Sequence, residues 1–388
     1  MVAAVIDRFR HRRWLFTLAM LLSCCLPLSA AVLPEDRIDA LYHSYEGGGI
    51  EINGPSVLVR KSIGQSVSVS GNYYVDAITS ASIDVITSAS PYTEERTENS
   101  LSADFMHEKS KLSLGYTTSE ENDFLARTVN FGVSQDVFGD LTTISLGYAR
   151  GWDEVGKTGS PTFSENVERR NFKLGVSQIL TKNFVMNLGF ETITDEGFLN
   201  NPYREVRYVS ADCAPKSYCK QLEVYPRTRT SNAVALRGMY YLPYRAKVHA
   251  DLRAFSDTWG ITAYTGEIGY THTYQDAWIF DVTYRQYQQD HASFYSDLFP
   301  YENAQDYLAR DKELSTYTSR DLGLGVTYQF ARGGWGFIDK GSLNLAYHRM
   351  WFDYDDFRDL RVECAPAGCE PLYSFYADVM QFYISLWY

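Results

Sequence analysis

The chain has 388 residues and a formal net charge of −12 at pH 7, from 36 Lys and Arg against 48 Asp and Glu. This acidic balance argues against a nucleic-acid-binding protein, because binding to phosphates depends on basic side chains. Tyr is frequent (30 residues), although 22% of the chain is charged. The combination is typical of a membrane β-barrel with an apolar outside and a polar inside; a soluble periplasmic β-protein is the alternative.

Residues 1–31 are predicted to be a signal peptide. Basic residues up to Arg13 precede an apolar stretch over residues 14–28, and small residues at 29–31 supply a cleavage site. A lipoprotein signal at Cys24 is the alternative, which the apolar residues after Cys24 disfavour. No later apolar run is long enough for a spanning helix. Since no linker follows, residues 32–388 are predicted to form a single outer-membrane β-barrel domain.

Apolar and polar residues alternate with a period of two in many segments. Trp278, Phe280 and Val282, for example, alternate with Asp281 and Thr283, and successive side chains of a strand point to opposite faces. A tilted strand needs about 9–11 residues to cross a bilayer, and most segments reach that length. We therefore predict an all-β fold, a transmembrane antiparallel up-and-down β-barrel of about 16 strands, with a range of 14–18. The predicted strands are residues 38–45, 55–63, 66–77, 97–107, 111–118, 124–136, 141–151, 168–179, 184–194, 227–242, 246–257, 262–274, 277–289, 319–330, 341–353 and 374–388.

The connections between these strands alternate in length, as is usual for barrels with short periplasmic turns and long outer loops. The long set comprises residues 78–96, 152–167, 195–226, 290–318 and 354–373. It contains all four cysteines of the mature chain, Cys213, Cys219, Cys364 and Cys369. An even number of cysteines in an oxidising compartment predicts two local disulfides, each closing one outer loop. Zinc is the alternative, but no His lies near either pair.

The C-terminus carries apolar residues at every second position and ends on an aromatic residue. This pattern resembles the signal that the barrel assembly machinery reads, so we expect that machinery as a partner during biogenesis and lipid as a partner afterwards. The predicted assembly signal consists of Met380, Phe382, Ile384, Leu386 and Tyr388.

Tryptophans near strand ends predict an aromatic girdle at the headgroup level, although Trp also favours the edges of soluble cores. The predicted girdle consists of Trp152, Trp259, Trp278, Trp351 and Trp387.

Charged residues on the polar faces of the strands predict a charged lumen, since Lys or Arg at the midplane of the lipid face costs about 2–4 kcal/mol. They could line a water-filled pore or pair across the interior and plug it. The alternation of charge from Lys247 to Arg253 favours pairing. The predicted lumen residues are Asp104, Glu191, Arg237, Lys247, His249, Asp251, Arg253, Glu267, Asp281 and Arg285.

Signs of enzyme chemistry are few. No short motif places a nucleophile beside a His, and no Gly-rich phosphate loop is present, so we expect no catalytic residues, cofactor or metal and hold an outer-membrane hydrolase as a minor alternative. Asp353, Asp355, Asp356 and Asp359 could bind Ca²⁺, but a solvated run of charge is the commoner outcome.

Several stretches resemble one family. They are residues 42–49 (YHSYEGGG), 53–61 (NGPSVLVRK), 80–85, 90–96 and 136–143 (DVFGDLTT). They resemble an uncharacterised Gram-negative outer-membrane family, domain-of-unknown-function family 3570. The resemblance implies an outer-membrane location, no established activity and no functional residues to carry over. It also implies neighbours such as a thioredoxin-like periplasmic protein, a small lipoprotein and a flavin transferase, and hence an envelope redox or flavin-linked system.

Together these features predict a monomeric barrel that acts as a channel or transporter for small solutes, in line with a strand count that can enclose an aqueous pore. The alternative is a non-conducting scaffold whose disulfide-closed outer loops bind a partner protein or lipoprotein.

Overall fold

The computed structural model describes residues 33–80, 92–213 and 217–388, and within them sixteen strands form one closed antiparallel barrel. The predicted fold class and strand number are therefore confirmed. The predicted leader lies outside the described residues, and the division into a leader and one barrel domain stays a prediction. The barrel strands are β1 (Arg37–Gly47), β2 (Ile50–Ile63), β3 (Val67–Ser80), β4 (Tyr92–His107), β5 (Ser110–Glu120), β6 (Phe124–Val137), β7 (Thr142–Gly156), β8 (Ser164–Thr181), β9 (Phe184–Gly197), β12 (Thr228–Leu242), β13 (Ala246–Asp257), β14 (Thr262–Tyr274), β15 (Trp278–Gln289), β16 (Tyr317–Phe330), β17 (Lys340–Arg358) and β18 (Leu372–Trp387).

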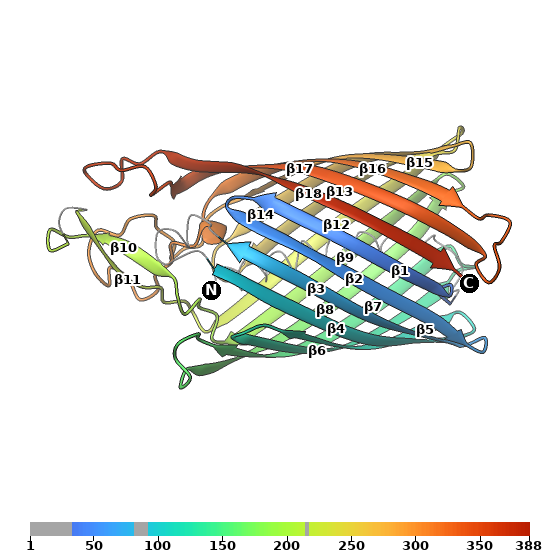
Figure 1. Cartoon of the computed structure of the whole chain (residues 1–388), viewed down its shortest axis with the longest axis horizontal. Coiled ribbons are helices and arrows are strands. Elements are labelled where there is room, and N and C mark those ends of the chain that lie inside the picture. Colours follow the sequence, from blue (N-terminus) through green and yellow to red (C-terminus); the bar gives the residue numbers. More distant parts are fainter. Residues whose placement is uncertain (1–32, 81–91, 214–216) are drawn as a thin grey trace.

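The first and last strands close the ring. β1 pairs with β18 from Arg37 opposite Trp387 to Gly47 opposite Ala377. Each other strand pairs with its neighbours in sequence, except that β9 pairs directly with β12. The two strands between them, β10 (Glu205–Val209) and β11 (Tyr218–Leu222), form a separate hairpin beyond one end of the barrel (Figure 1). This hairpin falls inside a predicted loop, because its strands are too short to give a period-two signal.

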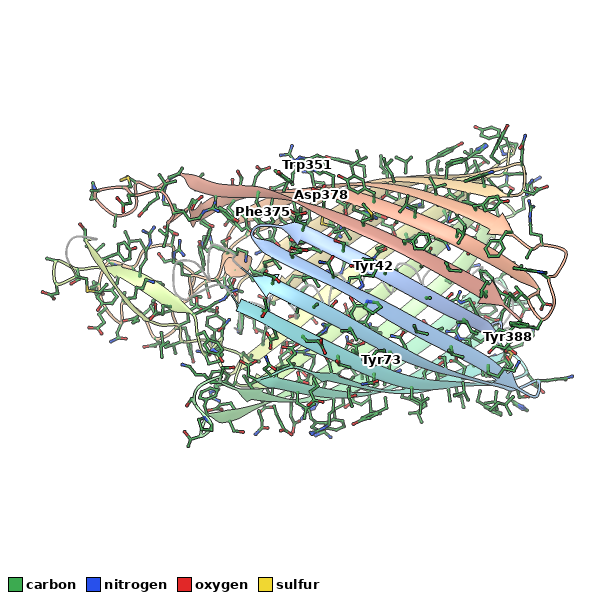
Figure 2. The ribbon with its side chains drawn as sticks, in the orientation of Figure 1. Tyr42, Tyr73, Trp351, Phe375, Asp378 and Tyr388 are labelled. Carbon is green, nitrogen blue, oxygen red and sulfur yellow. A yellow bond between two sulfur atoms is a disulfide. The ribbon has the colours of Figure 1, made fainter. Side chains whose placement is uncertain are left out.

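The strands have one apolar and one polar face, as the alternation predicts. On β15, Trp278, Phe280 and Val282 are exposed. Asp281 and Thr283, which alternate with them, are turned inward and half-buried. Figure 2 shows Tyr42, Tyr73 and Trp351 on the outward face of the wall. An apolar exterior without free strand edges is the arrangement that hydrocarbon requires, because a closed ring of strands pairs the backbone polar groups of each strand with those of its neighbours.

The two ends of the barrel differ. The short-turn end carries tight turns such as the one at Gln275 and Asp276, where both φ angles are positive (47° and 59°) as in a type I′ turn. Its one longer connection is 331–339. The long-loop end carries the connections 157–163, 198–227, 290–316 and 359–371. Both predicted cysteine pairs lie at this long-loop end.

The long-loop end also holds the main apolar core. Phe294 and Leu314 of the 290–316 connection pack with Trp259 and with Phe255 and Ala263, which are inward residues of β13 and β14. The same connection contains the 3-10 turn η1 (Lys312–Leu314). No helix in the described ranges has the length and apolar content to span a membrane. The loops therefore fold into the mouth of the barrel instead of extending freely from it.

Candidate functional site in the barrel lumen

The strands enclose a cavity of about 1290 Å³. Its lining reaches from Arg37, Lys340 and Trp387 at the short-turn end to Tyr74 and Arg96 farther along the barrel. All of its lining residues belong to barrel strands or to the 331–339 connection. The cavity is thus a space inside the wall, beneath the packed connections of the long-loop end.

The structure places all ten predicted lumen residues on inward-facing strand positions. Five of them line the cavity: Arg237, Lys247, His249, Glu267 and Asp281. The other five lie on the inward faces of their strands but do not line the cavity: Asp104, Glu191, Asp251, Arg253 and Arg285.

Many of these charges pair with one another between strands. The Arg237 guanidinium donates to Asp251, and His249 Nε2 lies 3.3 Å from Glu267 Oε1. Arg253 reaches Glu191 at 3.4 Å. The alternation of charge along β13 therefore produces cross-strand pairs, which lower the cost of placing charge inside a narrow lumen.

A buried polar cluster on β1, β3 and β4 was not predicted. His43 Nε2 lies 2.7 Å from Asp76 Oδ1 and 3.0 Å from the Tyr74 hydroxyl, and Arg96 holds the second carboxylate oxygen of Asp76 at 3.0 Å. His43 and Asp76 are nearly fully buried. The inward phase of each strand could have revealed these residues singly, but their meeting depends on the register between strands.

Among the described residues, two groups of side chains have the donor types of a metal site. His249, Asp251 and Glu267 form one, and Glu94, Glu121 and Asp123 the other, with ligand atoms within 4.8 Å of one another in each. Asp251 accepts from Arg237, so the first group forms ion pairs already. Asp123 of the second accepts from the Tyr203 hydroxyl at 2.7 Å. Burial, together with the bond to Asp123, raises the pKa of Tyr203 to about 12, so Tyr203 remains a donor at neutral pH.

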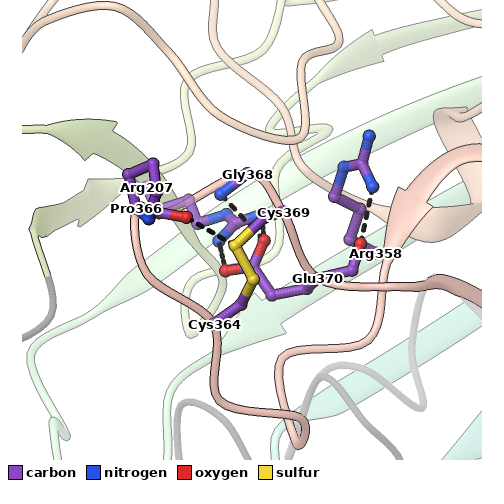
Figure 3. Close-up of a disulfide and its surroundings, with 7 residues drawn as sticks. All are labelled: Arg207, Arg358, Cys364, Pro366, Gly368, Cys369 and Glu370. Atoms are coloured by element: carbon purple, nitrogen blue, oxygen red, sulfur yellow. Dashed lines mark hydrogen bonds and ion pairs between the residues drawn. A yellow bond between two sulfur atoms is a disulfide. The ribbon is translucent and has the colours of Figure 1, made fainter.

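Arg207 on β10 joins three connections at the long-loop end, and Figure 3 shows its contact with Glu370 of the 359–371 connection. Its guanidinium donates to both oxygens of Glu370, at 2.6 and 3.2 Å, and to the carboxylate and the backbone carbonyl of Asp297. Burial disfavours the charge of Glu370, but the bonds from Arg207 lower the pKa of that carboxyl below its usual value. We call Arg207, Asp297 and Glu370 the loop clamp.

Each disulfide supports one side of the loop clamp. Cys213 pairs with Cys219 across the β10–β11 hairpin that carries Arg207, with Cα atoms 5.3 Å apart. Cys364 pairs with Cys369, the residue before Glu370. The backbone N–H of Gly368, inside this second loop, donates to Glu370 Oε2 at 2.9 Å. The disulfides therefore restrict the two segments that the buried ion pair joins.

Glu223 forms a second buried contact between the hairpin and the 290–316 connection. One oxygen accepts from the backbone N–H of Arg310 and the other from the Tyr225 hydroxyl, both at 2.7 Å. Arg204 pairs with Asp311 beside it. Burial raises the pKa of Glu223 to about 7, and the Asp311 charge adds to that rise although Arg204 opposes it.

The prediction of a girdle position is wrong for two of the five tryptophans, Trp259 and Trp387. Trp259 is only 5% exposed: it packs in the loop core against Phe294 and donates its indole N–H to the carbonyl of Thr228. Trp387 faces the cavity, because it alternates with the outward apolar residues of β18. Trp152, Trp278 and Trp351 are exposed on the outward face, the first and last toward the long-loop end and Trp278 at the short-turn end.

The C-terminal residues of the predicted assembly signal lie on β18 and just after it. Met380 and Phe382 are exposed on the outward face, Ile384 and Leu386 are half-buried, and Tyr388 bonds through its hydroxyl to the carbonyl of Arg60. Figure 2 places Tyr388 at the short-turn end. Their role in assembly stays a prediction.

The acidic run near the end of β17 contacts protein donors. Asp353 pairs with Arg320, Asp359 pairs with Arg361, and Asp356 accepts from the backbone N–H of Thr316 and lies 3.0 Å from His291 Nδ1. Asp356 therefore ties β17 to the 290–316 connection, whereas Asp353 is half exposed and Asp359 pairs within its own connection.

Comparison with protein families decides the membership of the chain. The family model described as "Protein of unknown function (DUF3570)" matches residues 18–338. The chain belongs to this family. The match extends from the N-terminal segment to the connection after β16, and no curated protein matches the sequence. Membership in DUF3570 therefore brings no established activity with it.

Several solved structures of outer-membrane proteins are similar to this DUF3570 member over most of its length. A bacterial polysaccharide outer membrane secretin has a TM-score of 0.49 and 8% identity, with 92% of this chain and 99% of that chain covered. The siderophore receptor PirA from Pseudomonas aeruginosa has a TM-score of 0.43 and 11% identity, with 92% and 64% covered. The outer membrane protein opdK from the same organism has a TM-score of 0.41 and 9% identity, with 92% and 100% covered. All three TM-scores lie below 0.5, so these likenesses assign no property to the chain.

Proposed function

We propose that the protein is a Gram-negative outer-membrane channel or transport barrel for small polar solutes, with its folded loops at the outer mouth. The cavity of about 1290 Å³ inside a wall with an apolar exterior carries this proposal. Polar and charged side chains give the cavity a surface that water and hydrophilic solutes can wet, and a sixteen-stranded wall is wide enough for an aqueous lumen.

The loop clamp sets how such a channel would work. Arg207 holds the β10–β11 hairpin to the connections 290–316 and 359–371, so passage requires these connections to separate or to leave a narrow path. The proposal includes no enzymatic step. It leaves room for an envelope redox or flavin-linked setting, with a lipoprotein or thioredoxin-like protein as partner, as the family resemblance implies.

Planar-bilayer recording on the purified mature protein tests the proposal. We expect small, rare conductance steps for the wild type and larger or more frequent steps for Arg207→Gln, because the variant loosens the loop clamp. No conductance in either protein at any voltage would contradict the proposal and favour the non-conducting scaffold.

A further inference from the structure

A row of basic residues crosses the barrel where its first and last strands meet. In the register of the sheet, Arg60 on β2 lies opposite Arg37 on β1, Arg37 lies opposite Trp387 on β18, and Trp387 lies opposite Lys340 on β17. All four side chains line the cavity at the short-turn end. We call Arg60, Arg37 and Lys340, together with Trp387 between the last two, the basic row.

Trp387 holds two of the cations apart. The Arg37 guanidinium lies 5.9 Å and the Lys340 ammonium 4.9 Å from the centre of its ring. Cations placed over an indole face are attracted to it, so the ring fixes both side chains beside the lumen. The inward position of Trp387, out of phase with the outward residues of β18, thus serves the row.

The charges of the row are only partly balanced. Arg37 pairs with Asp39 at 2.8 Å, and Lys340 pairs with Glu35 at 2.8 Å. The Arg60 side chain forms no ion pair or hydrogen bond with any residue that the structure describes, and its Nε is buried. Arg60 and Arg37 lie directly opposite each other on neighbouring strands, so their charges repel. Asp39 and Asp104 are the carboxylates near enough to Arg60 to favour its charge.

The geometry points to an anion-binding site at Arg60 and Arg37, open to solutes that enter the cavity from the short-turn end. An anion with a carboxylate or phosphate group would relieve the repulsion between the two guanidinium groups and accept their free N–H donors, in the fork geometry that Arg offers to such groups. Five cations line the cavity at the short-turn end and outnumber the three carboxylates that line it there, so this lining carries a positive balance among the described residues. The cations are Arg37, Arg60, Lys247, Arg332 and Lys340, and the carboxylates are Asp39, Asp281 and Asp339. The inference deepens the proposed function by naming small anions as the class of solute. It rests on that function for the passage of the solute through the barrel.

Calorimetric titration of the purified full-length mature protein with inorganic phosphate, and separately with citrate, tests binding without conduction. We expect saturable binding of at least one probe, weakened about ten-fold in Arg60→Gln, as for loss of a charge-assisted hydrogen bond. Arg60→Lys should weaken binding less, because it keeps the charge and loses the fork of donors. Lys61→Gln is the matched control: the same charge is removed one residue along, from a side chain on the outward face.

Absence of binding by the wild type, or equal affinity of Arg60→Gln and Lys61→Gln, would overturn the inference. Boiled and unboiled gel samples check that each variant forms the barrel. If Arg60→Gln does not form it, Arg37→Gln carries the test, because Arg37 supplies the other guanidinium of the site. Bilayer recordings in a KCl gradient then separate the two proposals. Binding without conductance would support the anion site and contradict the channel. Conductance without binding or anion preference would support the channel and contradict the anion site.

Discussion

Arg207 and Glu370 form a bidentate ion pair, at 2.6 and 3.2 Å, between side chains that are only 1% and 4% exposed. The residues are 163 positions apart in sequence. A pair so deeply buried is costly to break on one side, because the remaining charge loses its partner in a poorly solvated place.

Replacing Arg207 with Gln should therefore loosen the long-loop end without unfolding the wall. The local cost should be about 3–5 kcal/mol, and limited proteolysis should cut the connections 198–227 and 359–371 faster, while the unboiled gel band remains. Arg227→Gln is the control, since Arg227 pairs with Glu165 but is 62% exposed. Equal cleavage of both variants would show that the loop clamp does not hold the connections.

Removal of the second disulfide should weaken the same contact from the other side. In the double variant Cys364→Ser with Cys369→Ser, Glu370 keeps its partner but its segment gains conformational freedom, which opposes the ordered loop. Hydrogen exchange should accelerate at residues 359–371 and at Arg207, with strands β13 to β15 unchanged. If only residues near 364–369 exchange faster, the disulfide does not support the loop clamp.

Acidity should strengthen the folded loops through Glu223. Its pKa is raised from 4.5 to about 7 in the folded state, so the folded protein keeps a proton that the unfolded segment releases. Protonated Glu223 thus stabilises the folded loops at low pH. This contribution, on the order of 3 kcal/mol, is lost as the pH rises from about 4.5 to 7. Protection of residues 198–227 from hydrogen exchange, corrected for intrinsic rates, should fall between pH 5 and pH 8.

Glu223→Gln should remove most of this pH dependence, since the amide oxygen can still accept from Arg310 while the charge is gone. Glu302→Gln, at an exposed position on the 290–316 connection, is the matched control and should keep the wild-type profile. A profile that is as steep in Glu223→Gln as in the control would assign the pH dependence to another group.

The sequence alone predicts the strands of the barrel wall, but it does not predict how the connections fold in the mouth of the barrel. Alternation on β15 and β18 is a local property, so strands, faces and inward charges such as Asp281 follow from it. The loop clamp joins Arg207 to Glu370 through tertiary folding, which no spacing encodes. Trp259 was misplaced for the same reason, because its surroundings are loops that fold back onto β13 and β14.

Trp387 is different, because its position could have been derived from the sequence. It stands out of phase with Met380 and Phe382, so the same alternation that predicts the outward face of β18 places Trp387 inside. The basic row needs more than phase: only the register that pairs Arg37 with both Arg60 and Trp387 brings these side chains together.

Spin-label accessibility at two adjacent residues tests most directly whether hydrocarbon covers the outside of the barrel. Val282 is exposed on β15, and Thr283 lines the cavity. Nitroxide labels on Val282→Cys and Thr283→Cys, in protein reconstituted in lipid vesicles, should respond oppositely: the first to oxygen dissolved in the lipid, the second to a water-soluble nickel chelate. Equal access of the nickel chelate to both labels would contradict a membrane-embedded barrel.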